Sequence, residues 1–560
     1  MSTDFDTIQA WIDDDPDPAT AAEVAALLAQ AKGGSEAAAA DLADRFSGTL
    51  EFGTAGLRGV MGGGPNRMNR AVVIRAAAGL TAWLKDRLGT FTVVIGCDAR
   101  HGSAQFARDT AAVVTAAGGR ALLLPAARPT PVLAFAVRHL GADAGVMVTA
   151  SHNPPQDNGY KVYLGGSAVG QDARGVQIVP PYDTQIAAKI AEVGAVAEVP
   201  LAESGWEQLG DEIRQAYLER VISLVPFGRA TKLRIVLTSM HGVGDSTMRA
   251  ALEGAGFADV HVVREQAEPD PDFPTVAFPN PEEPGALDLA LALARKVRAD
   301  LVIANDPDAD RCAAAIPTPE GWVALSGDQV GWLLGEQAAS VAAMSGKGVL
   351  ACSIVSSRML ASIAESHGLQ HRYTLTGFKW ISRVPGLVFG YEEALGYCVD
   401  PEYVRDKDGI SAGVRLAFLA AQLDDQNESI PALLDRLERR HGAHATSPLT
   451  IRVTDLSRIS DVMAALRFAP PAALAGSPVV EFADLDEGWK DLPPTDGLFF
   501  LTAGGDRVVV RPSGTEPKLK CYLESIVPVG GGDLRAARAA AKVRVEAVKA
   551  DLASIIDAVG

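Results

Sequence analysis

The chain has 560 residues, which is too long for one hydrophobic core, and the usual size of domains predicts about four of them. Hydrophobic residues make up 48% and charged residues 21% of the sequence, as is ordinary for a soluble globular enzyme. The 51 basic and 69 acidic residues give a net charge of −18, which disfavours nucleic acid and anionic membranes as partners, so we expect a small-molecule substrate.

The start of the chain is acidic and lacks the basic and apolar regions of a signal peptide. No run approaches the ~20 apolar residues that a membrane helix needs. The five cysteines are scattered and form no C-x-x-C, which predicts reduced thiols and therefore a cytoplasmic protein. Both a monomer and a homodimer remain open.

Strand and helix patterns alternate along the first three quarters of the chain, which predicts α/β domains with buried sheets. We expect an N-terminal helical extension at 1–50 and then α/β domain I at 51–205, II at 206–322 and III at 323–443. Domain I should hold a helix at 72–88 and strands at 92–96, 121–125 and 145–149; domain II should hold strands at 234–238, 260–263 and 301–304.

The last quarter follows a different pattern. Several strand-like runs precede one long Ala-rich helix from about Leu534, which predicts a smaller α+β domain IV at 444–560. The polar stretch RHGAHATSP at 440–448 is typical of a linker before it, and a hinge there would let domain IV close over a substrate.

A serine, a histidine and a lysine follow the strand expected at 145–149. Ser151 would lie at the carboxyl end of that strand, where open α/β sheets bind ligands. A lone serine is a weak nucleophile and needs a base or a cation nearby, for which His152, Lys161 and Arg100 are candidates. The alternative is an Asn-Pro turn that closes the strand, with Ser151 as its cap.

Three aspartates, Asp306, Asp308 and Asp310, alternate after an apolar strand, so their carboxylates can converge on one hard cation. An EF-hand is excluded, because its sixth position would be Arg311 instead of Gly and its twelfth Pro317 instead of Glu. Three carboxylates leave room for an outside oxygen such as a phosphate, which suits Mg²⁺. A solvated acidic turn is the alternative.

Two further clusters indicate ligand recognition. Glu392 and Glu393, with Lys407 nearby, could accept and donate hydrogen bonds to sugar hydroxyls, although paired glutamates are most often plain surface. A Gly turn before them carries Thr376 and Lys379.

The last cluster combines basic and hydroxyl side chains with glycine, a composition that cradles phosphate but lacks the Walker order of a nucleotide loop. Its residues are Arg511, Ser513, Gly514, Thr515, Lys518 and Lys520. The alternative is a polar hairpin turn.

These clusters, in this order, resemble the α-D-phosphohexomutase family of phosphoglucomutases and phosphomannomutases. The matching stretches are FGTAGLRG, TASHNPPQDNGYKVY, DPDADR, TGFKW, GYEEALGY, RDKDG and RPSGTEPKLK, and the likeness covers about residues 45–530. It implies three similar α/β domains and a smaller C-terminal α+β domain around a central cleft. It also implies reversible transfer of phosphate between C1 and C6 of a hexose, through a phosphoserine and a bisphosphate intermediate.

The resemblance assigns roles to individual residues. Ser151 matches the phosphoserine, and the three aspartates match Mg²⁺ ligands whose shell the serine phosphate completes. Arg311 closes the metal loop, while Arg58 and Arg100 match arginines that face the active-site phosphate. Lys161 or His152 would handle the proton. The residues implied to contact the substrate are Arg311 at the metal loop, Thr376, Lys379, Glu392 and Lys407 for the sugar, and Arg511, Ser513, Gly514, Thr515 and Lys520 for its distal phosphate. Glucose 1,6-bisphosphate is the implied activator.

Two residues depart from the family pattern. Pro307 stands where Gly is usual and should stiffen the metal loop. Ala394 stands where serine is usual, so one hydroxyl contact to the sugar is lost, and GYEEALGY resembles the branch that includes phosphopentomutases. The alternatives within the family are therefore a phosphopentomutase and a glucose 1,6-bisphosphate synthase. Outside it they are a phosphatase that uses Ser151 or Asp306 as nucleophile, and a non-enzymatic sugar-phosphate sensor.

Overall fold

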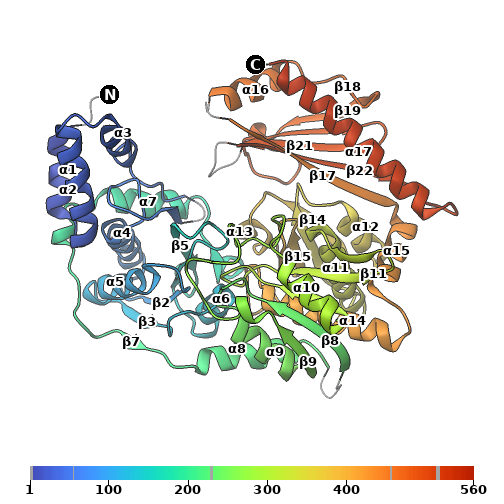
Figure 1. Cartoon of the computed structure of the whole chain (residues 1–560), viewed down its shortest axis with the longest axis horizontal. Coiled ribbons are helices and arrows are strands. Elements are labelled where there is room, and N and C mark those ends of the chain that lie inside the picture. The colour runs from blue at the N-terminus through green and yellow to red at the C-terminus, as the bar shows by residue number, and fades with distance from the viewer. Residues whose placement is uncertain (1–3, 54–55, 227–230, 454–456, 513–517, 560) are drawn as a thin grey trace. The chain divides into compact units, whose positions relative to one another are not determined.

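The computed structural model describes residues 4–53, 56–226, 231–453, 457–512 and 518–559 (Figure 1). They form two compact units. The first contains the residues up to Leu325 together with Ala394–Ala421, and the second contains Ser326–Glu393 and the residues from Gln422 onward. The third domain expected at 323–443 therefore contributes residues to both units.

The N-terminal segment is helical, as expected. Helices α1 (Phe5–Asp14), α2 (Pro18–Lys32) and α3 (Glu36–Arg45) each begin at a polar cap, where the side chains of Asp4, Asp17 and Ser35 accept a hydrogen bond from the first helical turn. The three helices pack together through Ile8, Val24, Leu28 and Leu42.

The first sheet has the strand order β1-β5-β4-β2-β3-β7, with β6 paired to β5. Its central strands β2, β3 and β4 are parallel and apolar, and they are buried between helices, while β5 runs antiparallel to β4. The elements are β1 (Leu57–Val60), α4 (Arg70–Leu88), β2 (Thr92–Cys97), α5 (Ser103–Ala116), β3 (Arg120–Leu123), α6 (Thr130–His139), β4 (Ala144–Val148), β5 (Asp157–Leu164), β6 (Val176–Gln177), α7 (Tyr182–Ala191) and β7 (Glu207–Gln208). Ser151 thus lies in the loop that joins β4 to β5, and Lys161 lies on β5.

The second sheet, also in the first unit, has the order β12-β11-β10-β8-β9. Its elements are α8 (Glu212–Ser223), β8 (Thr231–Thr238), α9 (Asp245–Gly254), β9 (Phe257–Val262), α10 (Asp288–Val297), β10 (Leu301–Ala304), β11 (Ala313–Thr318) and β12 (Gly321–Ala324). The aspartates lie in the loop between β10 and β11. The chain returns to this unit through β16 (Gly396–Cys398) and α14 (Gly409–Asp425), and the Cys312 N–H donates to the Leu395 carbonyl at 3.1 Å.

The second unit begins with a parallel sheet in which β13 lies between β14 and β15. Its elements are α11 (Gly327–Ala343), β13 (Val349–Ser353), α12 (Met359–Ser366), β14 (Gln370–Thr374), α13 (Phe378–Ile381), β15 (Leu387–Glu392) and α15 (Ile430–His441).

An antiparallel sheet of order β17-β22-β21-β20-β19-β18 completes the second unit. Its elements are β17 (Ala443–Arg452), α16 (Ser457–Phe468), β18 (Ala473–Leu474), β19 (Ser477–Asp484), β20 (Leu498–Thr502), β21 (Arg507–Pro512), β22 (Lys518–Val527) and α17 (Leu534–Asp557). The long α17 runs along this sheet and packs on it through Val545, Val548 and Leu552 (Figure 1). This arrangement confirms the expected order of α/β domains followed by an α+β domain.

The linker expected at 440–448 is wrong. These residues finish α15 and begin β17, which pairs with β22 from Ala443 to Arg452. Local polarity favoured a loop, but the neighbouring strand supplies a full ladder of hydrogen bonds, and pairing of this kind overrides local preference. None of the described helices is both long and apolar enough to cross a membrane.

Candidate active site

Ser151 lies at the start of the β4–β5 loop with a positive φ of 52°, and its side chain is almost fully buried. A left-handed backbone is costly for a residue other than glycine, and such strain is typical of functional positions. The Ser151 Oγ donates to Asp306 Oδ2 at 2.8 Å and lies 3.2 Å from His152 Nδ1. The loop thus aims one hydroxyl at an acidic and an imidazole group.

The buried guanidinium of Arg100 holds this loop. It donates hydrogen bonds to four backbone carbonyls, those of Ser151 (2.7 Å), Asn153 (2.5 Å), Pro154 (2.8 Å) and Asp157 (3.1 Å). Its hydrogen bonds therefore fix the backbone around the serine. That Arg100 also faces a phosphate stays a prediction. Its neighbour Arg58 donates to the Asn153 side chain at 3.2 Å.

The carboxylates of Asp306, Asp308 and Asp310 are fully buried, and one oxygen from each lies within 4.8 Å of the others. The backbone N–H of Arg311 donates to Asp306 Oδ1 at 3.0 Å and so ties the end of the loop to its start, whereas the role of the Arg311 side chain stays a prediction. Among the described residues, the Oδ1 atoms of Asp308 and Asp310 have no hydrogen-bond partner. Buried carboxylate oxygens without donors are costly, and this oxygen-only set fits a hard divalent cation such as Mg²⁺.

Two lysines lie against the aspartates. The Lys161 Nζ is 2.7 Å from Asp308 and 2.8 Å from Asp310, and the Lys407 Nζ is 3.2 Å from Asp310. Burial favours the neutral form of each carboxyl, but Lys161 and Thr130 lower the pKa of Asp308, and Lys161, Lys407 and Arg311 lower the pKa of Asp310. Burial and the two neighbouring carboxylates raise the pKa of Asp306 well above its usual value. The repulsion at Asp306 is what a bound cation would relieve.

His152 is surrounded by positive charge. Burial, Arg311 and Arg58 together hold the pKa of His152 well below its usual value of 6.5. The imidazole is therefore neutral near pH 7. Burial also lowers the pKa of Arg58, against the attraction of Asp308, but the residue stays positively charged.

The residues expected to recognise the substrate's sugar and distal phosphate lie in the second unit, apart from Lys407. The Gly377 N–H donates to Glu392 Oε1 at 2.5 Å, so the turn that carries Thr376 and Lys379 is tied to the end of β15. Arg511 lies directly opposite Lys520 on the neighbouring strand. Two cations at opposite positions repel each other, and an anion between them relieves this repulsion. Ser513, Gly514 and Thr515 lie outside the described residues.

The structure adds contacts that the sequence did not reveal. Thr130 donates its hydroxyl to Asp308 Oδ2 at 2.7 Å, and its N–H to the Asp308 carbonyl at 2.9 Å. Thr130 begins α6, far from the metal loop in sequence, and a threonine between two prolines carries no metal signal of its own. The sequence predicts a role in proton transfer for Lys161, but it does not reveal the contacts of Lys161 with Asp308 and Asp310.

Comparisons with known proteins agree with this geometry. Four phosphoglucomutase/phosphomannomutase family profiles match the chain: alpha/beta/alpha domain I at residues 49–195, domain II at 215–320, domain III at 326–440 and the C-terminal domain at 451–528. A Haemophilus influenzae protein named "Probable phosphomannomutase" is 48% identical over 462 residues, which cover 82% of this chain and 93% of that protein. The human phosphopentomutase is 35% identical over 583 residues, covering 95% and 92% of the two chains.

A solved structure shares the fold. The phosphoglucomutase/phosphomannomutase family protein of Burkholderia thailandensis superposes with a TM-score of 0.69 at 20% identity, covering 91% of this chain and 97% of that one. With all four family domains matched in order and the aspartate triad present, this chain belongs to the phosphoglucomutase/phosphomannomutase family and is a magnesium-binding phosphosugar mutase, an isomerase that transfers phosphate within its substrate.

Proposed function

We propose that this mutase interconverts the 1-phosphate and 6-phosphate of a hexose, glucose and also mannose, through a phosphorylated Ser151 and a hexose 1,6-bisphosphate. The observation that carries the proposal is the contact of the Ser151 hydroxyl with the buried aspartate triad at 2.8 Å. The relative with 48% identity, named as a phosphomannomutase, supports a hexose. Glucose 1,6-bisphosphate would act as the activator that phosphorylates Ser151. The five buried free cysteines accord with the cytoplasm as its compartment.

In the forward step a sugar hydroxyl oxygen attacks the phosphorus of phosphoserine, and the bond from phosphorus to Ser151 Oγ breaks. The sugar hydroxyl loses a proton and Oγ gains one. His152 Nδ1 lies 3.2 Å from Oγ and is placed to hold the proton that Oγ gains. Mg²⁺ held by Asp306, Asp308 and Asp310 would supply charge neutralisation for the phosphoryl oxygens. In the second step the bisphosphate returns its other phosphate to Ser151.

The residues around Ser151 support this chemistry by fixing positions. Phosphoryl transfer needs little covalent help from a protein, so catalysis depends on alignment and on charge. Arg100 fixes the serine loop through four carbonyls, and Lys161 holds Asp308 and Asp310 together. We assign recognition of the non-reacting phosphate to Arg511, Lys520 and the loop at Ser513, Gly514 and Thr515. Glu392, Thr376, Lys379 and Lys407 are assigned to the sugar.

A pentose phosphate is the second candidate substrate. The relatives named phosphopentomutase align with 95% of this chain, and Ala394 leaves the proposed sugar-recognition loop without the hydroxyl that a serine would supply. Turnover of glucose 1-phosphate, mannose 1-phosphate and ribose 1-phosphate under identical conditions with Mg²⁺ separates the candidates. We expect a hexose phosphate to give the highest kcat/KM. If ribose 1-phosphate exceeds both by a large factor, the hexose assignment is wrong.

The phosphorylated residue can be identified directly. After incubation with glucose 1,6-bisphosphate and Mg²⁺, peptide mass mapping should place the phosphate on Ser151, and Ser151→Ala should carry none. Phosphate on Asp306 would instead indicate an aspartyl-phosphate hydrolase and would overturn the mechanism.

A further inference from the structure

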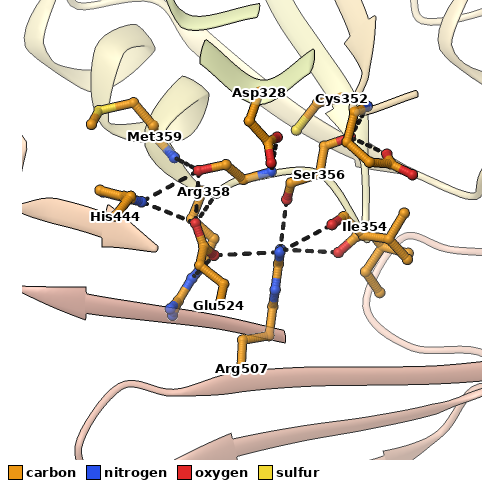
Figure 2. Close-up of polar contacts among 12 residues, drawn as sticks. Asp328, Cys352, Ile354, Ser356, Arg358, Met359, His444, Arg507 and Glu524 are labelled. Atoms are coloured by element: carbon orange, nitrogen blue, oxygen red, sulfur yellow. Dashed lines mark hydrogen bonds and ion pairs between the residues drawn. The ribbon is translucent and has the colours of Figure 1, made fainter. Parts of the chain in front are cut away.

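A second buried polar network lies in the second unit, in a part that the phosphate transfer itself does not use (Figure 2). Its centre is Glu524 on β22, which is fully buried. The carboxylate accepts hydrogen bonds from Ser357 Oγ (2.7 Å), from the Arg358 backbone (2.9 Å) and from Arg358 Nε (2.7 Å). His444 Nδ1 lies 2.9 Å from the same carboxylate. An acidic group with this many donors is held in one position.

Arg507 completes the network from the neighbouring strand. It lies directly opposite Glu524 in the pairing of β21 with β22, and the two side chains are 3.3 Å apart. Its buried guanidinium donates to the carbonyls of Ile354 (3.0 Å), Val355 (3.3 Å) and Ser356 (2.8 Å). Burial raises the pKa of Glu524, but Arg507 and the other donors outweigh it and hold this pKa well below the usual value. Both side chains are therefore charged.

Six of these hydrogen bonds, three to Glu524 and three from Arg507, involve one short segment, Ser353–Arg358, which leads from the end of β13 to α12 and which we call the brace loop. Apolar packing seals the same contact: Ile354 and Val355 cluster with Phe499 and Val509 of the antiparallel sheet. Leu375, next to the turn that carries Thr376 and Lys379, belongs to this cluster as well. The brace loop is thus clamped to β21 and β22 by ions and by apolar side chains.

The opposite side of the brace loop holds the loop assigned to the sugar. The Ser356 Oγ donates to Glu393 Oε2 at 2.8 Å and Ser353 Oγ does so at 3.2 Å. The Glu393 N–H returns a bond to Ser356 Oγ at 3.2 Å. Glu393 is the immediate neighbour of Glu392. One chain of contacts therefore runs from Glu524 and Arg507 through the brace loop to the glutamate pair.

The other end of β21, the strand that carries Arg507, holds the arginine assigned to the distal phosphate. Arg511 follows Arg507 by four residues on β21, so the two side chains share a face about 13 Å apart along the strand. A sugar bisphosphate has hydroxyls and a phosphate at a fixed separation. Misplacement of a recognition group by about 1 Å can cost roughly a hundredfold in rate.

We propose that the brace loop and the Arg507–Glu524 pair are positioning elements that set the distance between the sugar-recognition loop at Glu392 and the phosphate-recognition strand at Arg511. The inference rests on the proposed function for the ligand, but the mechanical link between the two segments does not depend on it. If the brace loop is loosened, the protein should bind the bisphosphate less tightly while the bisphosphate turns around between the two transfer steps. Ser356, Arg507 and Glu524 then act through other residues and do not touch the substrate.

The test compares two variants with two matched controls in the same unit. Ser356→Ala removes the bond to Glu393, whereas Ser525→Ala removes an equally buried serine bond to Asp506 at 2.7 Å. Arg507→Lys keeps the charge but cannot reach three carbonyls, whereas Arg538→Lys weakens an ion pair with Glu438 that has no contact with the brace loop. Ser356→Ala is the mild variant, in case Arg507→Lys does not fold.

We expect Ser356→Ala and Arg507→Lys to raise KM for glucose 1-phosphate by roughly fivefold or more, since coupling effects of this kind are commonly about 5- to 150-fold. They should also release more glucose 1,6-bisphosphate per turnover. Hydrogen exchange should rise in residues 376–380 and 388–395 of the free protein. The two controls should leave the exchange in these segments, the KM and the bisphosphate release within twofold of the parent.

These measurements distinguish failure of the proposed mutase function from failure of the proposed role of the brace loop. If the parent turns over no sugar phosphate, the proposed function fails, while the exchange experiment still decides whether the brace exists. If the parent is active and both variants keep the parent's hydrogen exchange, KM and bisphosphate release, the proposed positioning role of the brace loop is wrong. Equal changes in the controls would also overturn it, because they would reflect general loss of stability.

Discussion

Asp328, at the start of α11, allows a quantitative prediction about stability and pH. Its carboxylate accepts hydrogen bonds from the Ser357 N–H at 2.8 Å and from the Tyr391 hydroxyl at 2.9 Å, and it is almost fully buried. Burial, helped by Glu393 and Glu524 nearby, raises the pKa of Asp328 from 3.8 to about 6. A shift of this size corresponds to about 3 kcal/mol between the two protonation states.

The direction follows from which state binds the proton more tightly. The folded protein binds the Asp328 proton more tightly than the unfolded chain. The free energy of unfolding that this proton contributes is therefore fully present below pH 3.8 and is lost as the pH rises through about 6. At pH 8 the folded state holds a buried, ionised Asp328. Asp328→Asn keeps the acceptor oxygen for both bonds and removes the charge. We expect it to increase the free energy of unfolding by about 1 kcal/mol at pH 4.5 and by about 3 kcal/mol at pH 8.

Urea unfolding followed by circular dichroism at both pH values measures this difference. Asp424→Asn is the matched control, because Asp424 is an exposed aspartate in the same unit. An equal gain at pH 4.5 and pH 8 would show that relief of buried charge is not the cause. A loss of stability at pH 8 would show that the carboxylate is held by donors stronger than the two described.

Three further predictions concern the active site. Asp308→Asn should lower kcat by roughly a hundredfold or more, because it removes charge from the cation site, and the shift of the melting temperature by Mg²⁺ should shrink; unchanged kcat would exclude the metal role. Arg100→Lys should lower kcat by about tenfold or more with a native circular dichroism spectrum, because one ammonium cannot hold four carbonyls; parental kcat would mean that the serine loop needs no clamp. Arg511→Ala should raise KM and lower kcat by more than twofold each, while glucose 1,6-bisphosphate still phosphorylates Ser151 in part; if both constants stay within twofold, the phosphate assignment is wrong.

The candidate residues around Ser151 and the aspartate triad stand out in the sequence because each group is contiguous. Ser151 with His152, and the three alternating aspartates, follow apolar strands within a few residues, so the sheet edge and the loop place them without long-range information. The buried network around Glu524 could not be found in this way. Arg507 meets the carbonyls of Ile354 and Ser356 across more than 150 residues of sequence, and a lone arginine in a strand carries no pattern of its own.

The boundaries of the compact units also depend on contacts between distant segments, which the sequence alone does not reveal. The stretch at 440–448 is rich in small and polar residues, so its local preference indicates a loop, but α15 extends to His441 and β22 pairs with the chain from Ala443 onward. Residues 394–421 lie in the stretch expected as domain III, which the domain III family profile at 326–440 also covers, and they pack in the first compact unit, where Tyr217 donates its hydroxyl to Asp408 at 2.8 Å. In both cases the deciding interaction comes from a segment distant in sequence.

The three crossings of the chain between the two units have a consequence for synthesis on the ribosome. The first unit cannot be completed when Leu325 emerges, because Lys407 and the rest of Ala394–Ala421 belong to it. Roughly a hundred further residues must be translated first, which takes about 5–20 s at the usual rate. During that interval Asp310 lacks one of its two cations, and the surface that α14 will cover is exposed. Nascent chains paused between these points should therefore bind chaperones more strongly than chains paused after α14.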